Sequence, residues 1–141
     1  MKLPLRDFAD VIAALKGPAE NLSASEKRRS ARMTVFAKLN VFLVDDKNVR
    51  TFSALTRDIS LTGVGLLQST ALSAGQLVIL ALPRAQSPLF VVSTAMHCRP
   101  LADGLLAVGM EYVEMASKET CEMLLNNGQR EHARIAEAMR R

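Results

Sequence analysis

The chain has 141 residues, of which 49% are hydrophobic and 4% aromatic, and a formal net charge of +4 at pH 7. This length suits one domain with its own core, and the two cysteines, Cys98 and Cys121, form no C-x-x-C pair, which argues against a zinc site or a disulfide framework. The sequence has no run of about 18 apolar residues, and Asp7 and Asp10 interrupt its N-terminal apolar stretch, so it predicts no membrane insertion and no signal peptide and favours a cytoplasmic location.

The first predicted element is an amphipathic helix, which we assign to residues 1–17. Gly17 and Pro18 provide a stop signal for this helix. Residues 18–27 are small and polar without periodicity, and we interpret them as a linker. The apolar positions at helical spacing are Leu5, Phe8, Val11, Ile12 and Leu15.

Residues 28–115 are predicted to form one β domain. From Met33 to Val44 the pattern has period two, with Leu39 and Val41 on one face and Lys38 and Asn40 on the other. Further predicted strands cover residues 49–60, 63–69, 76–82, 88–99 and 104–113, each bounded by turn residues. Six antiparallel strands of this kind predict a small barrel or sandwich. Residues 116–141 are then predicted to form a C-terminal helix, in which Ser117 can act as the N-cap.

The positive charge is concentrated near the first strand. The window from Lys27 to Arg50 contributes +5 and the rest of the chain −1. A local positive field is expected of an anion-binding site rather than of a protein that coats a polyanion. The basic residues of this window are Lys27, Arg28, Arg29, Arg32, Lys38, Lys47 and Arg50.

Two short motifs carry the functional information. Arg28 and Arg32 form an Arg-x-x-x-Arg pair, a spacing that recurs at Arg130 and Arg134 and has no diagnostic value alone. Residues 58–63 follow one strand hairpin later and contain Asp-x-Ser-x-x-Gly, and a chain of this composition would contain the pattern [Asp/Asn]-x-Ser-x-x-Gly by chance only about 0.04 times. The second motif is therefore the informative one.

In order and spacing, Arg28 and Arg32 followed by Asp58, Ser60 and Gly63 resemble the paired signature of the PilZ domain family, whose members bind the bacterial second messenger cyclic di-GMP. The final "VGMEYV" is also similar to the last strand of that family. The resemblance implies a six-stranded antiparallel PilZ-like β-barrel with flanking helices.

The resemblance also implies a site, in which Arg28 and Arg32 clamp phosphate and guanine while Asp58, Ser60 and Gly63 form the opposing wall. Arginine suits this task because its planar fork can pair with phosphate oxygens or with guanine O6 and N7. Asp58 can accept from a guanine N–H edge, Ser60 can donate or accept, and Gly63 allows close backbone approach or positive φ. For Arg29 two alternatives stay open, since it either projects away from the site or stacks on a second guanine.

This interpretation predicts a non-enzymatic receptor with no cofactor besides its ligand and with a protein partner of unknown identity. One competitor is a PilZ-like interaction module without nucleotide binding. Another is a basic β-barrel that binds single-stranded nucleic acid, which the low aromatic content disfavours. His97 and Cys98 are interpreted as packing or surface residues because no third group completes a catalytic set.

Overall fold

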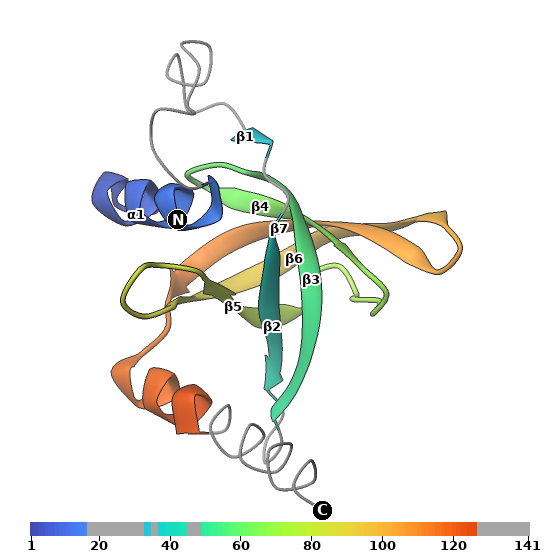
Figure 1. Cartoon of the computed structure of the whole chain (residues 1–141). Helices are drawn as coiled ribbons and strands as arrows, with labels where there is room; N and C mark the ends of the chain where they lie inside the picture. The colour runs from blue at the N-terminus through green and yellow to red at the C-terminus, as the bar shows by residue number, and fades with distance from the viewer. Residues whose placement is uncertain (17–32, 35–36, 45–48, 127–141) are drawn as a thin grey trace, which may run out of the picture.

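The computed structural model describes residues 1–16, 33–34, 37–44 and 49–126 (Figure 1). Arg28, Arg29 and Arg32, the linker predicted at 18–27, and the last part of the helix predicted at 116–141 lie outside these described residues. In the described part of the chain, no helix combines the length and the apolar character needed to cross a membrane.

The described strands build a closed antiparallel barrel. Six of them pair in the order β3-β2-β5-β6-β7-β4, and a further pairing between β4 and β3 closes the ring, while β1 adds a short pairing to β3. The predicted six-stranded antiparallel barrel is thus confirmed. The strands are β1 (Met33–Thr34), β2 (Lys38–Val44), β3 (Val49–Ile59), β4 (Gly63–Gln68), β5 (Leu77–Leu82), β6 (Leu89–Ala102) and β7 (Leu105–Met115).

The first predicted strand is divided into β1 and β2. Met33 pairs with Ile59 and Lys38 pairs with Leu55, so the register against β3 shifts by one residue between the two pieces. At Ala37, next to β2, the backbone N–H donates to the Thr56 hydroxyl oxygen at 2.9 Å, while the carbonyl oxygen accepts the Thr56 backbone N–H at 2.7 Å. Along β2 the predicted alternation holds, because Leu39 and Val41 are buried whereas Lys38 and Asn40 are exposed.

The barrel interior is filled with apolar side chains contributed by every long strand. The largest fully buried ones include Tyr112, Ile59, Leu66, Leu80, Met110, Val41 and Val91. A six-stranded barrel is narrow enough for such side chains to occupy its whole interior. Any ligand site must therefore lie on the outer surface.

A second, smaller cluster lies outside the barrel. Phe42 and Phe90 meet edge to face with ring centroids 6.0 Å apart, and Leu124 of the C-terminal helix, described over 118–126, packs with them at 1% exposure. The predicted C-terminal helix therefore covers part of the outer face of β2, β5 and β6 (Figure 1).

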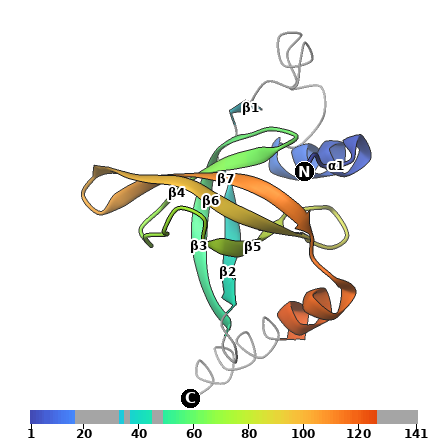
Figure 2. The same cartoon turned by 180° about the vertical axis from the view of Figure 1, so that it is seen from behind.

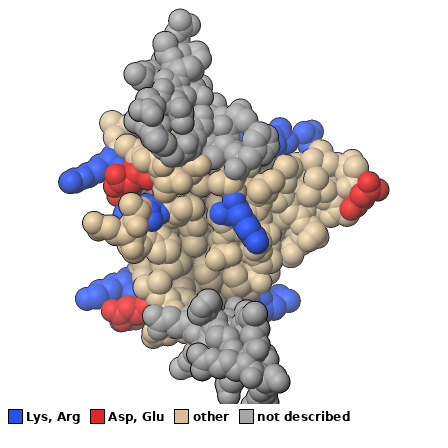
Figure 3. All heavy atoms as spheres, in the orientation of Figure 1, with Lys and Arg blue, Asp and Glu red and all other residues tan. Residues whose placement is uncertain are grey.

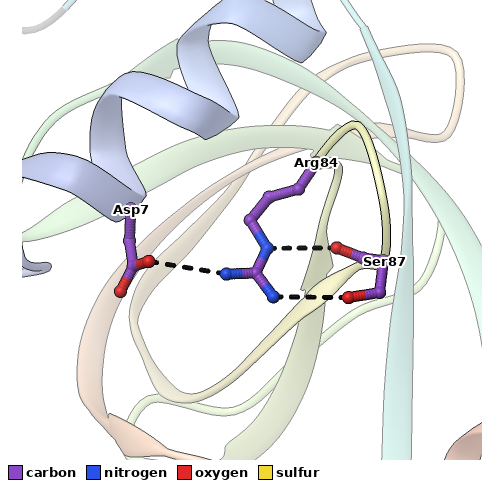
Figure 4. Close-up of polar contacts among 3 residues, drawn as sticks. All are labelled: Asp7, Arg84 and Ser87. Carbon is purple, nitrogen blue, oxygen red and sulfur yellow. Dashed lines mark hydrogen bonds and ion pairs between the residues drawn. The ribbon is translucent and has the colours of Figure 1, made fainter.

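The N-terminal helix α1 (Leu5–Lys16) packs against the main core through Val11 and Ile12. Figure 4 shows how Asp7 of α1 is tied to the β5–β6 turn: Arg84 Nη1 lies 3.4 Å from Asp7 Oδ1, and the same guanidinium donates to the Ser87 carbonyl oxygen and hydroxyl at 3.0 and 3.4 Å. Seen from behind, α1 and the C-terminal helix remain at opposite ends of the barrel, and the β6–β7 hairpin projects away from it (Figure 2).

Candidate functional site

The turn between β3 and β4 carries Ser60 and Gly63. Ser60 donates its backbone N–H to the Gly63 carbonyl oxygen at 2.9 Å, and its hydroxyl donates to the same oxygen at 3.3 Å while accepting from the Thr62 N–H at 3.3 Å. Ser60 is only 5% exposed. The hydroxyl thus both donates and accepts within the turn, and the Thr62 hydroxyl oxygen lies 3.4 Å from it, so Ser60 shapes the turn.

Gly63 is required by the close approach of β7. A Cβ at this position would overlap the Met110 carbonyl oxygen and would lie 3.3 Å from the Glu111 Cα. Among the described residues, positive φ values are found only at Gly75, Asp103 and Gly104, so Gly63 does not use the left-handed conformation that the sequence left open. The structure thus gives Gly63 a packing reason, namely the close approach of the β7 backbone.

Asp58 lies on the outer face of the barrel because of a β-bulge. The register between β3 and β4 shifts between Thr56 and Asp58, so Arg57 is an extra residue in β3. Thr56 and Ile59 are both 0% exposed and face the interior. Strict alternation from Thr56 would turn Asp58 inward, and the extra residue reverses this parity.

The Asp58 carboxylate leans over its neighbour strand. Its Oδ1 accepts the Gly65 backbone N–H at 3.1 Å, and its Oδ2 lies 4.0 Å from Arg57 Nε, with 22% of the side chain exposed. A Cβ on Gly65 would stand only 2.6 Å from Asp58 Oδ1. The absence of a side chain at Gly65 thus makes room for the carboxylate of Asp58.

The same arrangement is repeated on the other side. Asp58 pairs with Gly65, Gly65 with Gly109, and Gly109 with His97, so these four residues form one row across β3, β4, β7 and β6. A Cβ on Gly109 would overlap His97 Nε2 and lie 2.7 Å from His97 Cε1. His97 therefore leans over Gly109 as Asp58 leans over Gly65.

This row crosses an open hollow of about 490 Å³ on the barrel surface. Arg57 lies beside Asp58 at one edge, and Arg99 lies two residues beyond His97 on β6. The hollow thus combines one carboxylate, two guanidinium groups and an imidazole over a floor of glycine and small apolar residues. Its lining consists of Arg57, Asp58, Gly65, Leu66, His97, Arg99, Ala107, Val108 and Gly109.

Of the five residues in the two predicted motifs, the structure describes Asp58, Ser60 and Gly63, and it places them on one strand end and the turn that follows. It adds Arg57, His97 and Arg99, which the sequence did not assign to the site. His97 was interpreted as a packing or surface residue, and it is exposed, whereas Cys98 packs against the main core. β7 and β4 lie between β6, which carries His97, and β3, which carries Asp58. Only this strand order could have linked His97 to Asp58.

The N-terminal segment reaches the same turn. The Leu3 N–H donates to the Leu61 carbonyl oxygen at 2.8 Å, and the terminal ammonium of Met1 donates to the Tyr112 carbonyl oxygen at 2.8 Å. Leu61 lies between Ser60 and Gly63. A change at the turn would therefore be felt directly by the chain that leads into α1.

The described surface shows no other concentrated charge on the face drawn in Figure 3, where Lys and Arg side chains stand as separate groups. Within the ranges that the structure describes, no group of three or more His, Cys, Asp or Glu side chains could hold a metal ion. The chemical character of the site comes from the motif turn and the hollow beside it.

Comparison with known proteins gives a family match. A model of the PilZ domain matches residues 26–127. No curated protein sequence matches the chain at a significant level.

Two solved structures are similar in fold. YcgR from Escherichia coli, solved in complex with c-di-GMP, is 13% identical with a TM-score of 0.47, and the alignment covers 81% of this chain and 51% of that one. The inhibitor of motility MotI/DgrA from Bacillus subtilis is 19% identical with a TM-score of 0.44, covering 78% of this chain and 56% of that one. The chain thus spans about half the length of either protein.

Proposed function

Because the chain belongs to the PilZ domain family, a family of cyclic di-GMP receptors, we propose that it is a non-enzymatic receptor that binds cyclic di-GMP and relays the binding to a protein partner. The proposed ligand residues are Arg28, Arg32, Asp58, Ser60 and Gly63, with Arg29 as a contact to a second guanine if two stacked ligands bind.

The observation that carries this proposal is the position of Asp58. Its carboxylate is fixed by the Gly65 N–H and still partly exposed at the edge of a hollow large enough for part of a nucleotide. A carboxylate held in this position is a suitable acceptor for the N–H edge of guanine. Ser60 and Gly63 support it by shaping the turn that follows.

The arginine motif would enter from the neighbouring strand. Arg32 immediately precedes Met33, and Met33 and Thr34 pair with Ile59 and Asp58. Consecutive Cα atoms are about 3.8 Å apart, so the pairing anchors the chain next to Asp58 at the point where the arginine motif ends. This attachment supports a site in which Arg28 and Arg32 act together with Asp58.

The proposed relay uses the N-terminal segment. Leu3 is bonded to Leu61 inside the motif turn, and α1 follows two residues later. Ligand contacts that shift the turn would change the anchoring of α1, and the surface of α1 is then the place where a protein partner would sense the messenger.

The nucleic-acid alternative gains no support from the described aromatic residues. Phe42, Phe90 and Tyr112 are buried, and Phe8 and Phe52 pack against the main core. Proteins that bind single strands usually offer stacking aromatics along a basic groove. None of the five described Phe and Tyr rings is available as such a platform.

Calorimetric titration with cyclic di-GMP tests the proposal. We expect binding by the unmodified chain, and we expect Arg32→Ala and Asp58→Ala each to weaken it by about 1–3 kcal/mol, the range for charged or bidentate base contacts. Arg6→Ala and Asp10→Ala are matched controls, because both residues are exposed on α1, and these variants should bind as the parent does. Absence of binding heat from the parent at tens of micromolar would refute the proposed function.

A further inference from the structure

The hollow beside the motif turn has two sides that are built alike. On β3 the extra residue is Arg57, and Asp58 follows it; on β6 the register shifts between Ala95 and His97, so the extra residue is Met96. Ala95 is 0% exposed and Cys98 packs against the core. The bulge at Met96 thus turns His97 outward, as the bulge at Arg57 turns Asp58 outward.

Between the strands of these two side chains, the barrel wall carries glycines at two neighbouring positions. Gly65 and Gly109 are paired neighbours on β4 and β7, and both occupy outward positions where any other residue would place a side chain. Asp58 on β3 and His97 on β6 are separated by the two strands that carry these glycines, and each of the two side chains lies over the glycine beside it. A planar base would therefore lie above these side chains, against the exposed face of His97, and not on the glycines themselves.

We propose that His97 and Arg99 form a second wall of the cyclic di-GMP site, in which the His97 imidazole stacks on a guanine base and Arg99 pairs with a phosphate of the same ligand. This inference rests on the proposed function and assigns it two contacts outside the paired motifs.

The chemistry of both side chains suits these roles. Unstacked bases in single-stranded nucleic acids are held by aromatic side chains, histidine included, and by guanidinium planes. Arg99 is exposed and presents a planar fork that matches the oxygens of a phosphate. With Arg57 on the opposite side, the hollow would offer two cations to a ligand that carries two phosphates.

Binding of cyclic di-GMP to four variants tests the second wall. We expect His97→Ala and Arg99→Ala each to weaken binding by about 5- to 150-fold, the ratio that corresponds to about 1–3 kcal/mol for a base or phosphate contact. Leu101→Ala is the control for His97, since Leu101 is an exposed apolar residue of the same strand outside the hollow, and Arg6→Ala is the control for lost charge. Both controls should bind within about twofold of the parent.

Stacking has a spectroscopic signature that a structural role of His97 would not produce. A guanine face above the imidazole should move the His97 Cε1–H resonance upfield when cyclic di-GMP is added, while the only other histidine, His132, supplies an internal reference. Gly109→Ala, which displaces His97 without removing it, should abolish this shift and weaken binding as His97→Ala does.

The outcomes separate the two hypotheses. If the parent binds cyclic di-GMP and Asp58→Ala weakens it, but His97→Ala and Arg99→Ala bind normally and the His97 resonance does not move, the second wall is wrong and the proposed function stands. If the parent shows no binding at all, the proposed function fails and the second wall fails with it.

Discussion

Replacing either of the two glycines of β4 by alanine should separate the folding role of the motif from its binding role. At Gly63 the new Cβ would meet the backbone of β7, with the Met110 carbonyl oxygen overlapped and both the Met110 carbonyl carbon and the Glu111 Cα at 3.3 Å. At Gly65 the three nearest atoms all belong to the Asp58 carboxylate, and Oδ1 is the closest at 2.6 Å. A carboxylate can rotate away, whereas a paired strand cannot.

The expected magnitudes follow from these contacts. Gly63→Ala forces β4 and β7 apart, which costs about 1–3 kcal/mol for overpacking and about 1 kcal/mol for a weakened ladder hydrogen bond. Alanine returns about 0.4–1 kcal/mol by restricting the unfolded chain, so the net destabilisation is about 2–3 kcal/mol. Gly65→Ala loses the hydrogen bond to Asp58, which costs about 1–3 kcal/mol for a charged acceptor. The same restriction of the unfolded chain offsets part of this cost, so the free energy of unfolding should fall by about 1 kcal/mol.

Urea denaturation and thermal melting of both variants beside the parent provide the measurement. A loss of 2–3 kcal/mol corresponds to a drop in Tm of roughly 6–12 °C for a domain of this size, and the smaller loss to about 4 °C. Gly65→Ala should remain folded at room temperature and should still weaken cyclic di-GMP binding, since Asp58 is displaced. A Gly63→Ala variant as stable as the parent, or a Gly65→Ala variant that is the less stable of the two, would contradict this reasoning.

Three further results are expected. Leu124→Ala should cost about 2–5 kcal/mol by opening a cavity against Phe42 and Phe90, whereas Leu125→Ala, at 43% exposure, should stay within about 0.5 kcal/mol in the same urea titration. Arg84→Ala should cost less than about 1 kcal/mol in thermal melting, because its ion pair with Asp7 is partly exposed and solvent-screened. Single-stranded RNA or DNA should bind weakly, with an affinity that falls steeply as salt rises in a fluorescence anisotropy titration, and tight binding that persists at high salt would favour the nucleic-acid alternative.

The strands were predictable because their apolar residues alternate, and the exceptions have local causes. Just before β2, the Ala37 N–H and carbonyl oxygen both bond to the hydroxyl of Thr56, a partner 19 positions away that no pattern within one strand reveals. Similarly, β6 continues through Pro100, which the sequence placed beyond the strand end. Since β5 pairs with β6 only up to Thr94, the missing N–H of Pro100 breaks no ladder bond on that side.

The outer cluster was not predictable from alternation. Phe42 occupies the face of β2 that also carries Lys38 and Asn40, and it is nevertheless buried at 7% exposure because the C-terminal helix covers it. Period-two patterns report which side faces the barrel interior, but they do not report what covers the other side. The sequence predicted a helix over residues 116–141 without indicating which strands this helix would cover.

For the candidate site, sequence spacing identified the motif turn but not the hollow beside it. Asp58 and His97 are 39 positions apart, and each reaches the outer face only because one inserted residue reverses the parity of its strand. A bulge changes no residue type and leaves no signal in composition. The placement of His97 in the same row as Asp58 therefore follows only from the strand order and both registers.

The filled interior explains why the site is built in this way. A narrow barrel whose interior is packed with side chains such as Ile59, Leu66 and Met110 has no internal volume for a dinucleotide, so the proposed ligand would be held on the convex outer surface. A convex surface becomes concave only where some positions have no side chain and the neighbouring side chains project outward. Two paired glycines, flanked by two bulges that raise Asp58 and His97, meet both conditions. In the proposed site, selectivity would therefore depend on strand irregularities, and substitutions at the glycines should act on binding by moving the side chains beside them.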